Sequence, residues 1–385
     1  MTSFLIRLYG LCVVQELMVI YPFYAVMFVD YGLSAMEISW LFTVWAGITL
    51  LLEVPSGVLA DKYSRRFILS VAQLFSVAGF ACWGLFPGFW GFFFGFVLWG
   101  TKSALSSGTF EALIYDELKR FGCEAQFVKV NGRSLAFNTT GVILSSFAAA
   151  AAAALVDYGY PVLIGASVAV SVVASFMALL LPPAPPTQLT TPRPYFTVLG
   201  EGVRYAWRSP VILRLIAFAS LAIALGGGLD EFYTIFANEA GLPRYALGIF
   251  LGSIYAVQAA AGFVAHRFEG LSLRWLYAAF LGGGALLTIS AWWMGQWSVL
   301  LLGASGLVFQ VIALIVEGRL QHMIPSEIRA TVSSVRGFSA ESFGIGLFIG
   351  MGLIVGEGSY RPGFLTFGVL GLVIGLCYLL FGRKE

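Results

Sequence analysis

The sequence predicts an all-α polytopic membrane protein with twelve transmembrane helices in two pseudo-symmetric six-helix bundles. Of its 385 residues, 59% are hydrophobic and 11% are charged, whereas about 25% are charged in soluble domains. A water-soluble fold has too little polar surface to cover so many apolar side chains. The apolar runs are long enough for bilayer-spanning helices and do not alternate as barrel strands do.

Twelve candidate spans divide six and six around a central linker. The predicted spans are 4–28, 37–60, 67–86, 90–111, 130–155, 160–181, 211–236, 244–266, 274–294, 297–319, 332–355 and 362–382. The linker opens on a proline-rich run that cannot continue a helix. Its amphipathic end, from Tyr195 to Trp207, predicts a helix on the membrane surface. The predicted domains are therefore an N-terminal bundle (1–181), a cytoplasmic linker (182–210) and a C-terminal bundle (211–385).

The distribution of basic residues predicts the orientation. With a cytoplasmic N-terminus, all of the 22 Lys and Arg residues except Arg244, Arg361 and Lys102 fall on the inner side. Cytoplasmic loops carry an excess of Lys and Arg. We therefore expect a multi-pass protein of the inner (plasma) membrane with both termini in the cytoplasm.

The two predicted bundles resemble each other in sequence. Three pairs of positions lie 203 to 206 residues apart: 57–63 with 262–268, Glu111 with Glu317, and Arg133 with Arg336. A parallel duplication of six-helix units favours a solute path near the membrane midplane, between the halves.

Residues 57–66 concentrate charge between the second and third spans, and we expect a short cytoplasmic loop there. This stretch resembles the signature loop of the major facilitator superfamily of secondary transporters. Gly57, Asp61, Arg65 and Arg66 match the signature, Lys62 stands in for an arginine, and Ser64 replaces a second glycine. Residues 107–116 and 324–331 resemble further stretches of the superfamily.

The resemblance implies alternating access, in which two six-helix bundles rock about a central cavity. It also implies that Asp61 faces the start of the eleventh helix as part of a cytoplasmic gate, where the helix dipole favours an anion. Arg65 or Arg66 would reach Glu111 or Asp116 at the end of the fourth helix. The alternative is that these charges only fix topology.

Other residues complete the expected gate. Glu53 lies on the cytoplasmic side of the second span, and Arg133 opens the fifth. The resemblance suggests a branch of drug–proton antiporters. However, the fifth span lacks the Gly-Pro motif common in that branch, which weakens this assignment.

Ionisable side chains within spans are costly and are treated as functional candidates. Glu16 lies near the middle of the first span and Lys102 near the middle of the fourth. Glu16 is a candidate proton carrier, and Lys102 is a candidate site for an anionic group of the solute. The alternative is that the two neutralise each other as a structural pair.

Four further ionisable residues are candidates for the cavity. Glu341 lies near the middle of the eleventh span, one and a half turns after Arg336. Asp230 and Glu231 follow three glycines at 226–228, which we expect to unwind the seventh span. Adjacent residues point in different directions, so at most one of these two acids is expected to face the cavity.

The predicted function is proton-coupled secondary transport, with export of a small organic or amphipathic compound as the first choice. The transport alternative is proton-coupled uptake of a small metabolite, for which Lys102 would suggest an anionic solute. A lipid flippase or transporter-like sensor is the alternative of another class. No enzymatic constellation, phosphate-binding loop or metal-ligand cluster is evident. We therefore expect a transporter without enzyme activity, cofactor or nucleic-acid partner, working as a monomer in the lipid bilayer.

Overall fold

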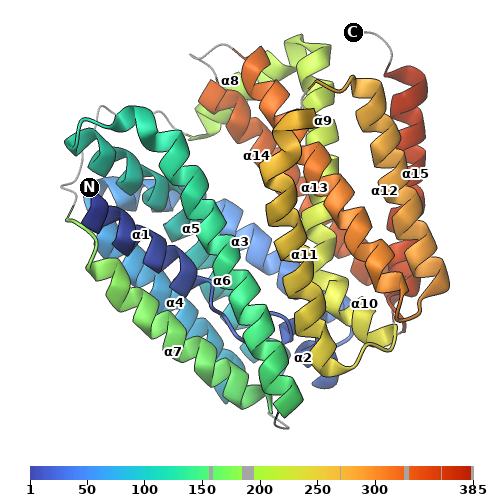
Figure 1. Ribbon diagram of the computed structural model, residues 1–385, viewed down its shortest axis with the longest axis horizontal. Coiled ribbons are helices and arrows are strands. Elements are labelled where there is room, and N and C mark those ends of the chain that lie inside the picture. The colour runs from blue at the N-terminus through green and yellow to red at the C-terminus, as the bar shows by residue number, and fades with distance from the viewer. Residues whose placement is uncertain (156–158, 184–194, 269, 325–328, 357, 383–385) are drawn as a thin grey trace. The chain divides into compact units, whose positions relative to one another are not determined.

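The structure is a computed structural model that describes residues 1–385 except 156–158, 184–194, 269, 325–328, 357 and 383–385. Every regular element in the described ranges is a helix (Figure 1). The first seven α-helices are α1 (Thr2–Gln15), α2 (Tyr24–Asp30), α3 (Ala35–Lys62), α4 (Arg65–Leu85), α5 (Phe89–Arg120), α6 (Phe127–Leu155) and α7 (Tyr160–Leu179). The others are α8 (Tyr195–Arg208), α9 (Pro210–Ile223), α10 (Tyr233–Glu239), α11 (Arg244–Val264), α12 (Leu273–Trp293), α13 (Ser298–Met323), α14 (Arg329–Val355) and α15 (Arg361–Phe381).

The chain packs as two compact units. Unit 1 comprises Met1–Leu33, Leu41–Pro192 and Arg244–Ala256, and unit 2 comprises Ser34–Trp40, Arg193–Pro243 and Val257–Glu385. The units differ from the predicted bundles mainly at two short segments, 34–40 and 244–256. The bundle boundaries 1–181, 182–210 and 211–385 remain predictions.

Ten helical segments among the described residues are long and apolar enough to cross a membrane. Two predicted spans are not among these ten. The first is divided into the shorter helices α1 and α2, and the fourth lies within α5. The total of twelve spans therefore remains a prediction. The predicted surface helix is present as α8, which packs on α9 and α14.

Three expectations about local structure were wrong. The first span is not one helix, because residues 16–23 are non-helical. The fourth helix does not end at Glu111, because α5 has 32 residues and ends at Arg120. The loop predicted at 57–66 is only Tyr63 and Ser64, since α3 continues to Lys62. Ser64 has φ −58°, which L residues readily adopt, so no glycine is needed at this turn.

In unit 1, α4 packs between α5 and α7, and α1 packs on α6 and α7 (Figure 1). A cluster of aromatic side chains from α2, α3, α4 and α5 fills the space between these helices. Tyr24, Phe42, Trp83 and Phe96 are each at most 4% exposed, and Tyr24 stacks on Trp83 with ring centroids 5.9 Å apart. In unit 2, α12 packs between α13 and α15, and α9 packs against α13 and α14.

Candidate functional site

The break in the first span places Glu16 directly after the last residue of α1. The backbone N–H groups of Glu16 and Leu17 donate to the carbonyls of Val13 and Val14, at 3.3 and 3.1 Å. Pro22 contributes to the break because it has no N–H and disfavours helical geometry in the residue before it. The chain becomes helical again only at Tyr24. Glu16 therefore lies where the end of α1 leaves backbone carbonyls without helical partners.

Lys102 of α5 lies beside Glu16. The Lys102 Nζ atom is 3.9 Å from Glu16 Oε1, and the side chains are 10% and 20% exposed. This distance is too long for a hydrogen bond but short enough for strong attraction in a low dielectric. The C-terminal end of a helix also favours a nearby cation. The structure thus brings these two predicted residues together as a loosely closed ion pair.

Three amide side chains form a polar chain next to this pair. Gln15 Nε2 donates to Asn138 Oδ1 of α6 at 3.0 Å, and Gln73 Nε2 of α4 donates to Gln15 Oε1 at 3.2 Å. Gln73 is only 2% exposed. These three residues were not predicted, because amide side chains are not ionisable. Their occurrence within apolar spans was the available signal, since polar groups there require partners.

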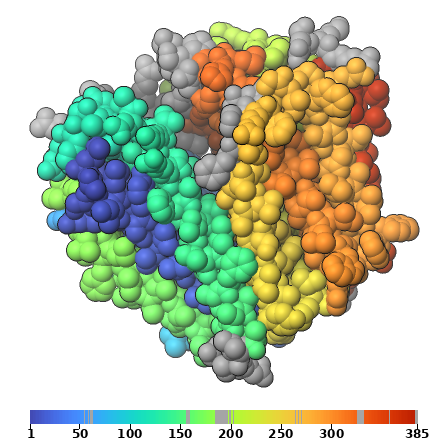
Figure 2. Space-filling view, in the orientation of Figure 1, coloured from blue at the N-terminus to red at the C-terminus, as the bar shows by residue number. Residues whose placement is uncertain are grey.

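A close approach of α6 to α1 fixes the position of Glu16. A Cβ atom at Gly141 would lie 2.3 Å from the Val13 carbonyl oxygen and 2.9 Å from Glu16 Cβ. Only glycine permits this contact, which is one reason why α1 and α6 lie side by side without a gap (Figure 2).

Most aromatic side chains near the pair form part of the packed core. Tyr24 is 4% exposed and Trp99 is 9% exposed, with ring centroids 6.0 Å apart. Tyr21 is partly exposed, and its hydroxyl lies 3.0 Å from the Tyr255 hydroxyl within unit 1. Tyr21 is therefore better placed than Tyr24 or Trp99 to contact a solute.

The seventh span is irregular near its two acidic residues. After α9, residues Ala224–Gly228 form a π-helix and Leu229–Phe232 a 3₁₀-helix, before α10 begins. The glycines were expected to unwind the span, but the chain stays helical there and changes its pitch instead. Asp230 and Glu231 lie on the 3₁₀ turn and are both partly exposed. π-Helical turns within longer helices are frequent at functional sites.

Two ion pairs link neighbouring helices away from this site. In unit 1, the Arg65 guanidinium pairs with Asp116 and donates to the Ala112 carbonyl. In unit 2, Arg336 Nε lies 2.8 Å from Glu317 Oε2. Gln321 also donates to Glu317 at 2.8 Å. Arg336 thus contacts Glu317, the residue that corresponds to Glu111 in the second half of the sequence. This pair joins α13 to α14.

The remaining gate candidates are distributed around unit 1. Glu111 accepts a hydrogen bond from Asn131 at 3.4 Å. Arg66 donates to the carbonyls of Leu179 and Leu181, each at 3.4 Å, so it ties α4 to the end of α7.

Four other candidates lie at exposed positions. Gly57, Glu53 and Arg133 are exposed, as is Glu341 of α14 in unit 2. The side chains of Asp61 and Lys62 lie outside the described part of the structure. The cytoplasmic gate therefore remains a prediction.

A further polar cluster in unit 1 was not predicted. Tyr160 donates to Asp30, Arg244 donates to the Tyr160 hydroxyl at 3.0 Å, and Arg244 Nη2 lies 2.6 Å from Asp30 Oδ2. These three residues are far apart in the sequence, so no local sequence pattern indicates that they meet. The only signal was that Arg244 is one of the few basic residues predicted on the outer side. Among the described residues, no three His, Cys, Asp or Glu side chains gather as metal ligands would.

The family model of the Major Facilitator Superfamily matches residues 8–349. The chain belongs to this superfamily. It is therefore a membrane transporter and not an enzyme, and the all-α transporter fold predicted from the sequence is confirmed. No curated protein matches the chain significantly by sequence.

Solved structures of several transporters share the fold. A mutant of the nucleoside transporter NupG has a TM-score of 0.80 at 13% identity, covering 98% of this chain and 99% of that one. An inward-facing, occupied bacterial homolog of the human lysosomal transporter Spinster has a TM-score of 0.77 at 15% identity, covering 100% and 97%. A D-xylose–proton symporter has a TM-score of 0.74 at 12% identity, covering 99% and 97%. These structures do not single out a drug–proton antiporter branch.

Proposed function

We propose that this superfamily member couples proton movement to symport of a small polar solute bearing an anionic or hydrogen-bond-accepting group. The observation that carries the proposal is the loosely closed Glu16–Lys102 pair at the break in the first span. Glu16 is the proposed proton carrier and Lys102 the proposed partner of the solute.

The pair provides a physical basis for coupling. Protonation of Glu16 removes the charge that balances Lys102, and an uncompensated buried charge is strongly unfavourable. An anionic group of the solute restores the balance, so proton and solute stabilise each other's binding. Because Nζ and Oε1 are 3.9 Å apart, no direct hydrogen bond has to break when the solute enters. Cooperative binding of proton and solute produces symport.

The neighbouring amides favour a polar solute. Gln15, Gln73 and Asn138 offer both donors and acceptors beside the ion pair. A ligand with hydroxyl or carbonyl groups can exchange hydrogen bonds with this chain, whereas an apolar compound would leave the amides unsatisfied. This supports uptake of a small metabolite, the second of the two transport functions considered from the sequence.

Proton-coupled export of a cationic compound is the second candidate. It is favoured by the greater exposure of Glu16, whose side chain is 20% exposed compared with 10% for Lys102. A cationic solute and a proton would then compete for the same carboxylate. Competition of this kind produces antiport, as expected of an efflux transporter.

Flux measurements in proteoliposomes distinguish the two candidates. Purified protein is reconstituted with an imposed pH gradient, and a panel of anionic, neutral polar and cationic compounds is tested. Symport predicts that anionic or polar compounds accumulate in the alkaline compartment. Accumulation of cationic compounds in the acidic compartment would support antiport and reject the symport proposal. Binding without net flux would instead support a sensor, and movement of lipid between leaflets a flippase.

We also propose that Asp61 forms part of the cytoplasmic gate. The Arg65–Asp116 pair supports this, because it holds against α5 the start of α4, which follows Asp61 closely in the sequence. Asp61→Asn is expected to slow transport several-fold at unchanged expression, since exposed ion pairs contribute only about 0–1 kcal/mol each. Unchanged transport would show that the charge of Asp61 serves only to fix the membrane topology.

A further inference from the structure

One polar cluster of unit 1 plays no part in the proposed solute site. Asp30 ends α2, Tyr160 opens α7 and Arg244 opens α11. Arg244 Nη2 lies 2.6 Å from Asp30 Oδ2, and Arg244 Nη1 donates to the Tyr160 hydroxyl at 3.0 Å. The Tyr160 hydroxyl in turn donates to Asp30. Each side chain therefore contacts the other two, in a closed ring of charge-assisted hydrogen bonds.

The ring joins parts of the chain that the sequence assigns to different bundles. Asp30 and Tyr160 belong to the predicted N-terminal bundle, whereas Arg244 belongs to the predicted C-terminal bundle. In the structure, however, Arg244–Ala256 belong to unit 1. The predicted topology places all three side chains at the outer face of the bilayer. The ring thus ties the predicted outer end of α11 to unit 1.

Close packing continues from this ring along α11. A Cβ atom at Gly248 would lie 2.5 Å from the Ser146 carbonyl oxygen and 3.0 Å from Ala150 Cβ, both on α6. A Cβ atom at Gly252, about one turn further along α11, would lie 3.1 Å from Ser146 Cβ. Small residues spaced four apart on two facing helices are typical of tight contacts in membranes. The first half of α11 is therefore packed on α6 without room for a solute between these two helices.

The other short segment that departs from the predicted bundles is packed in the same way. Ser34–Trp40, which includes the start of α3, belongs to unit 2. A Cβ atom at Gly352 of α14 would lie 2.9 Å from Ser39 Cβ and 3.1 Å from Met36 Cα. The predicted topology places this contact at the outer face as well. Both segments are thus held by close glycine contacts on the same predicted side of the membrane.

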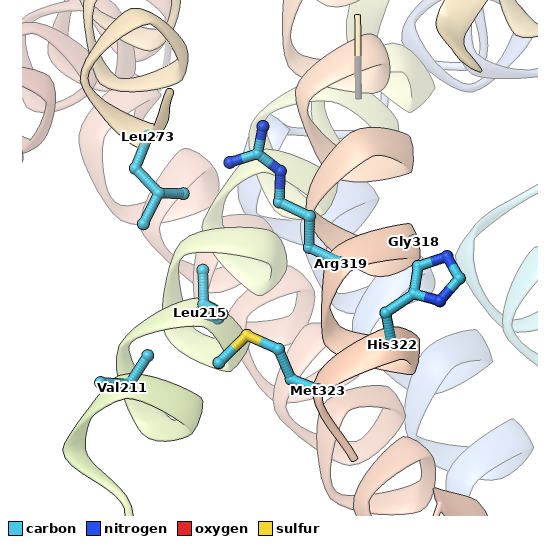
Figure 3. A pocket seen from close by; sticks show the side chains of 7 residues that line it. All are labelled: Val211, Leu215, Leu273, Gly318, Arg319, His322 and Met323. Atoms are coloured by element: carbon cyan, nitrogen blue, oxygen red, sulfur yellow. The ribbon is translucent and has the colours of Figure 1, made fainter. Parts of the chain in front are cut away.

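The predicted inner side of unit 2 is packed more loosely. A cavity of about 560 Å³ lies there, between the starts of α9 and α12 and the end of α13 (Figure 3). Figure 3 shows Met323 extending toward Val211 and Leu215, which line this cavity. Packing is therefore tighter where the outer ends of α3 and α11 are held than at the inner end of unit 2.

We propose that Asp30, Tyr160 and Arg244 form an outer latch, which holds the first half of α11 against unit 1 and must open before solute passes on the outer side. From Arg244 to Tyr255, α11 rises about 16 Å, roughly half of the hydrocarbon core. The Tyr255 hydroxyl lies 3.0 Å from that of Tyr21. The latched stretch therefore extends from the outer face to the break in the first span.

The outer latch is suited to reversible opening. The Arg244 side chain is 57% exposed and the Asp30 side chain is 29% exposed, so water can solvate both partners when they separate. A fully buried pair would be much harder to separate. A contact of this strength can bias the equilibrium between two transport states without fixing it. The latch is independent of the solute and the coupling ion proposed above.

Distance measurements by pulsed electron paramagnetic resonance on the intact, reconstituted chain test the outer latch without a solute. The four native cysteines are replaced by alanine, and spin labels are attached at Val162→Cys on α7 and Tyr245→Cys on α11, two exposed positions next to the latch. The wild-type latch should give mainly the short distance of the closed state. Arg244→Gln should raise the ratio of long to short distances about 3- to 10-fold. Arg361→Gln, which alters a basic residue predicted on the outer side but located in unit 2, should leave the ratio unchanged.

A double-mutant cycle distinguishes a latch from unrelated surface charges. Asp30→Asn should raise the ratio as much as Arg244→Gln does, and the double variant should raise it no further, because either single change already breaks the ion pair. Tyr160→Phe should have a smaller effect, since the direct contact between Asp30 and Arg244 remains. Unchanged distances in Arg244→Gln, or additive effects in the double variant, would overturn the proposal.

A salt titration provides a second test that does not depend on the folding of a charge variant. Raising sodium chloride from about 0.1 M to about 1 M shortens the Debye length from about 10 Å to about 3 Å. The ratio of long to short distances should therefore rise in the protein with an intact latch, and it should stay constant in the Asp30→Asn, Arg244→Gln double variant. A ratio that does not respond to salt when the latch is intact, or that responds equally in both proteins, would contradict the proposal.

Discussion

The first and seventh spans are both irregular next to acidic residues, but they depart from the α-helix in different ways. In the first span the helix stops at Gln15, and Glu16 faces Lys102 beside a chain of amides. In the seventh span the chain stays helical and changes pitch across a glycine-rich segment. The first arrangement creates a site where charge can be exchanged. The second creates a segment that can adjust its length and direction.

The two irregular segments also differ in residue type, since the break in the first span contains Pro22 and the seventh span carries glycines at 226–228. Proline removes a backbone donor and restricts its predecessor, so it can end a helix. Glycine lowers helix stability without removing a hydrogen bond. If this comparison is correct, mutations around Glu16 should affect coupling, whereas mutations in 224–232 should affect rate.

The largest effect is expected from Lys102→Gln. Removing one partner of a buried pair is unfavourable by about 3–5 kcal/mol where burial is complete. Since this pair is partly exposed, we expect a 10- to 100-fold loss of solute affinity. Equilibrium binding measures this loss, with Lys119→Gln as the control because Lys119 is exposed on the same helix. Equal losses of affinity in the two variants would show that Lys102 does not bind the solute.

Gly141→Ala should destabilise unit 1 where α6 meets α1. The added Cβ would lie 2.3 Å from a backbone oxygen, and overpacking typically costs about 1–3 kcal/mol. Thermal unfolding in detergent is expected to show a clear loss of stability. Gly132→Ala is the matched control, since nothing lies within 4 Å of a Cβ at that position of α6. A stable Gly141→Ala variant would show that α1 does not depend on this contact.

Glu231→Gln should slow transport several-fold without abolishing proton-driven accumulation. The substitution keeps the size of the side chain in the 3₁₀ turn but removes its charge. Initial rates and final accumulation under a pH gradient separate the two effects. If accumulation disappears in this variant and persists in Glu16→Gln, the coupling site lies in the seventh span and our comparison is reversed.

The smallest effect is expected from Gly227→Ala. A Cβ at this position meets nothing within 4 Å, and alanine favours a helix over glycine by about 0.5–1 kcal/mol. Stability should therefore be unchanged or slightly higher, while turnover falls because the segment is stiffer. Gly226→Ala provides the contrast, since its Cβ would lie 3.1 Å from Phe309 Cβ. Faster turnover by Gly227→Ala would argue against a role for flexibility here.

The sequence predicted most helices because apolar length sets a bilayer span. Spans 244–266 and 274–294 end within two residues of α11 and α12. Apolar length in the sequence could not predict which prolines interrupt a helix. Pro22 lies in a break, whereas Pro55 lies inside α3. The difference depends on packing and on alternative hydrogen bonds, such as the one from the Ile20 N–H to Ser167 Oγ at 3.0 Å.

The candidate site was predictable only where charge made it conspicuous. Glu16 and Lys102 stood out because ionisable groups are rare in apolar spans. Gln15, Gln73 and Asn138 come from three helices, and their hydrogen bonds follow from the tertiary fold. The same is true of Asp30, Tyr160 and Arg244. The helical extension beyond Glu111 was missed because hydropathy marks where a helix leaves the membrane, and not where it ends.

The central claim is that Glu16 carries the coupled proton. Its most direct test is Glu16→Gln in proteoliposomes, in which proton-driven accumulation and solute exchange are measured on the same preparation. We predict that accumulation is lost while exchange of labelled for unlabelled solute continues, because the binding site survives without its titratable group. Full proton-driven accumulation by Glu16→Gln would contradict the account.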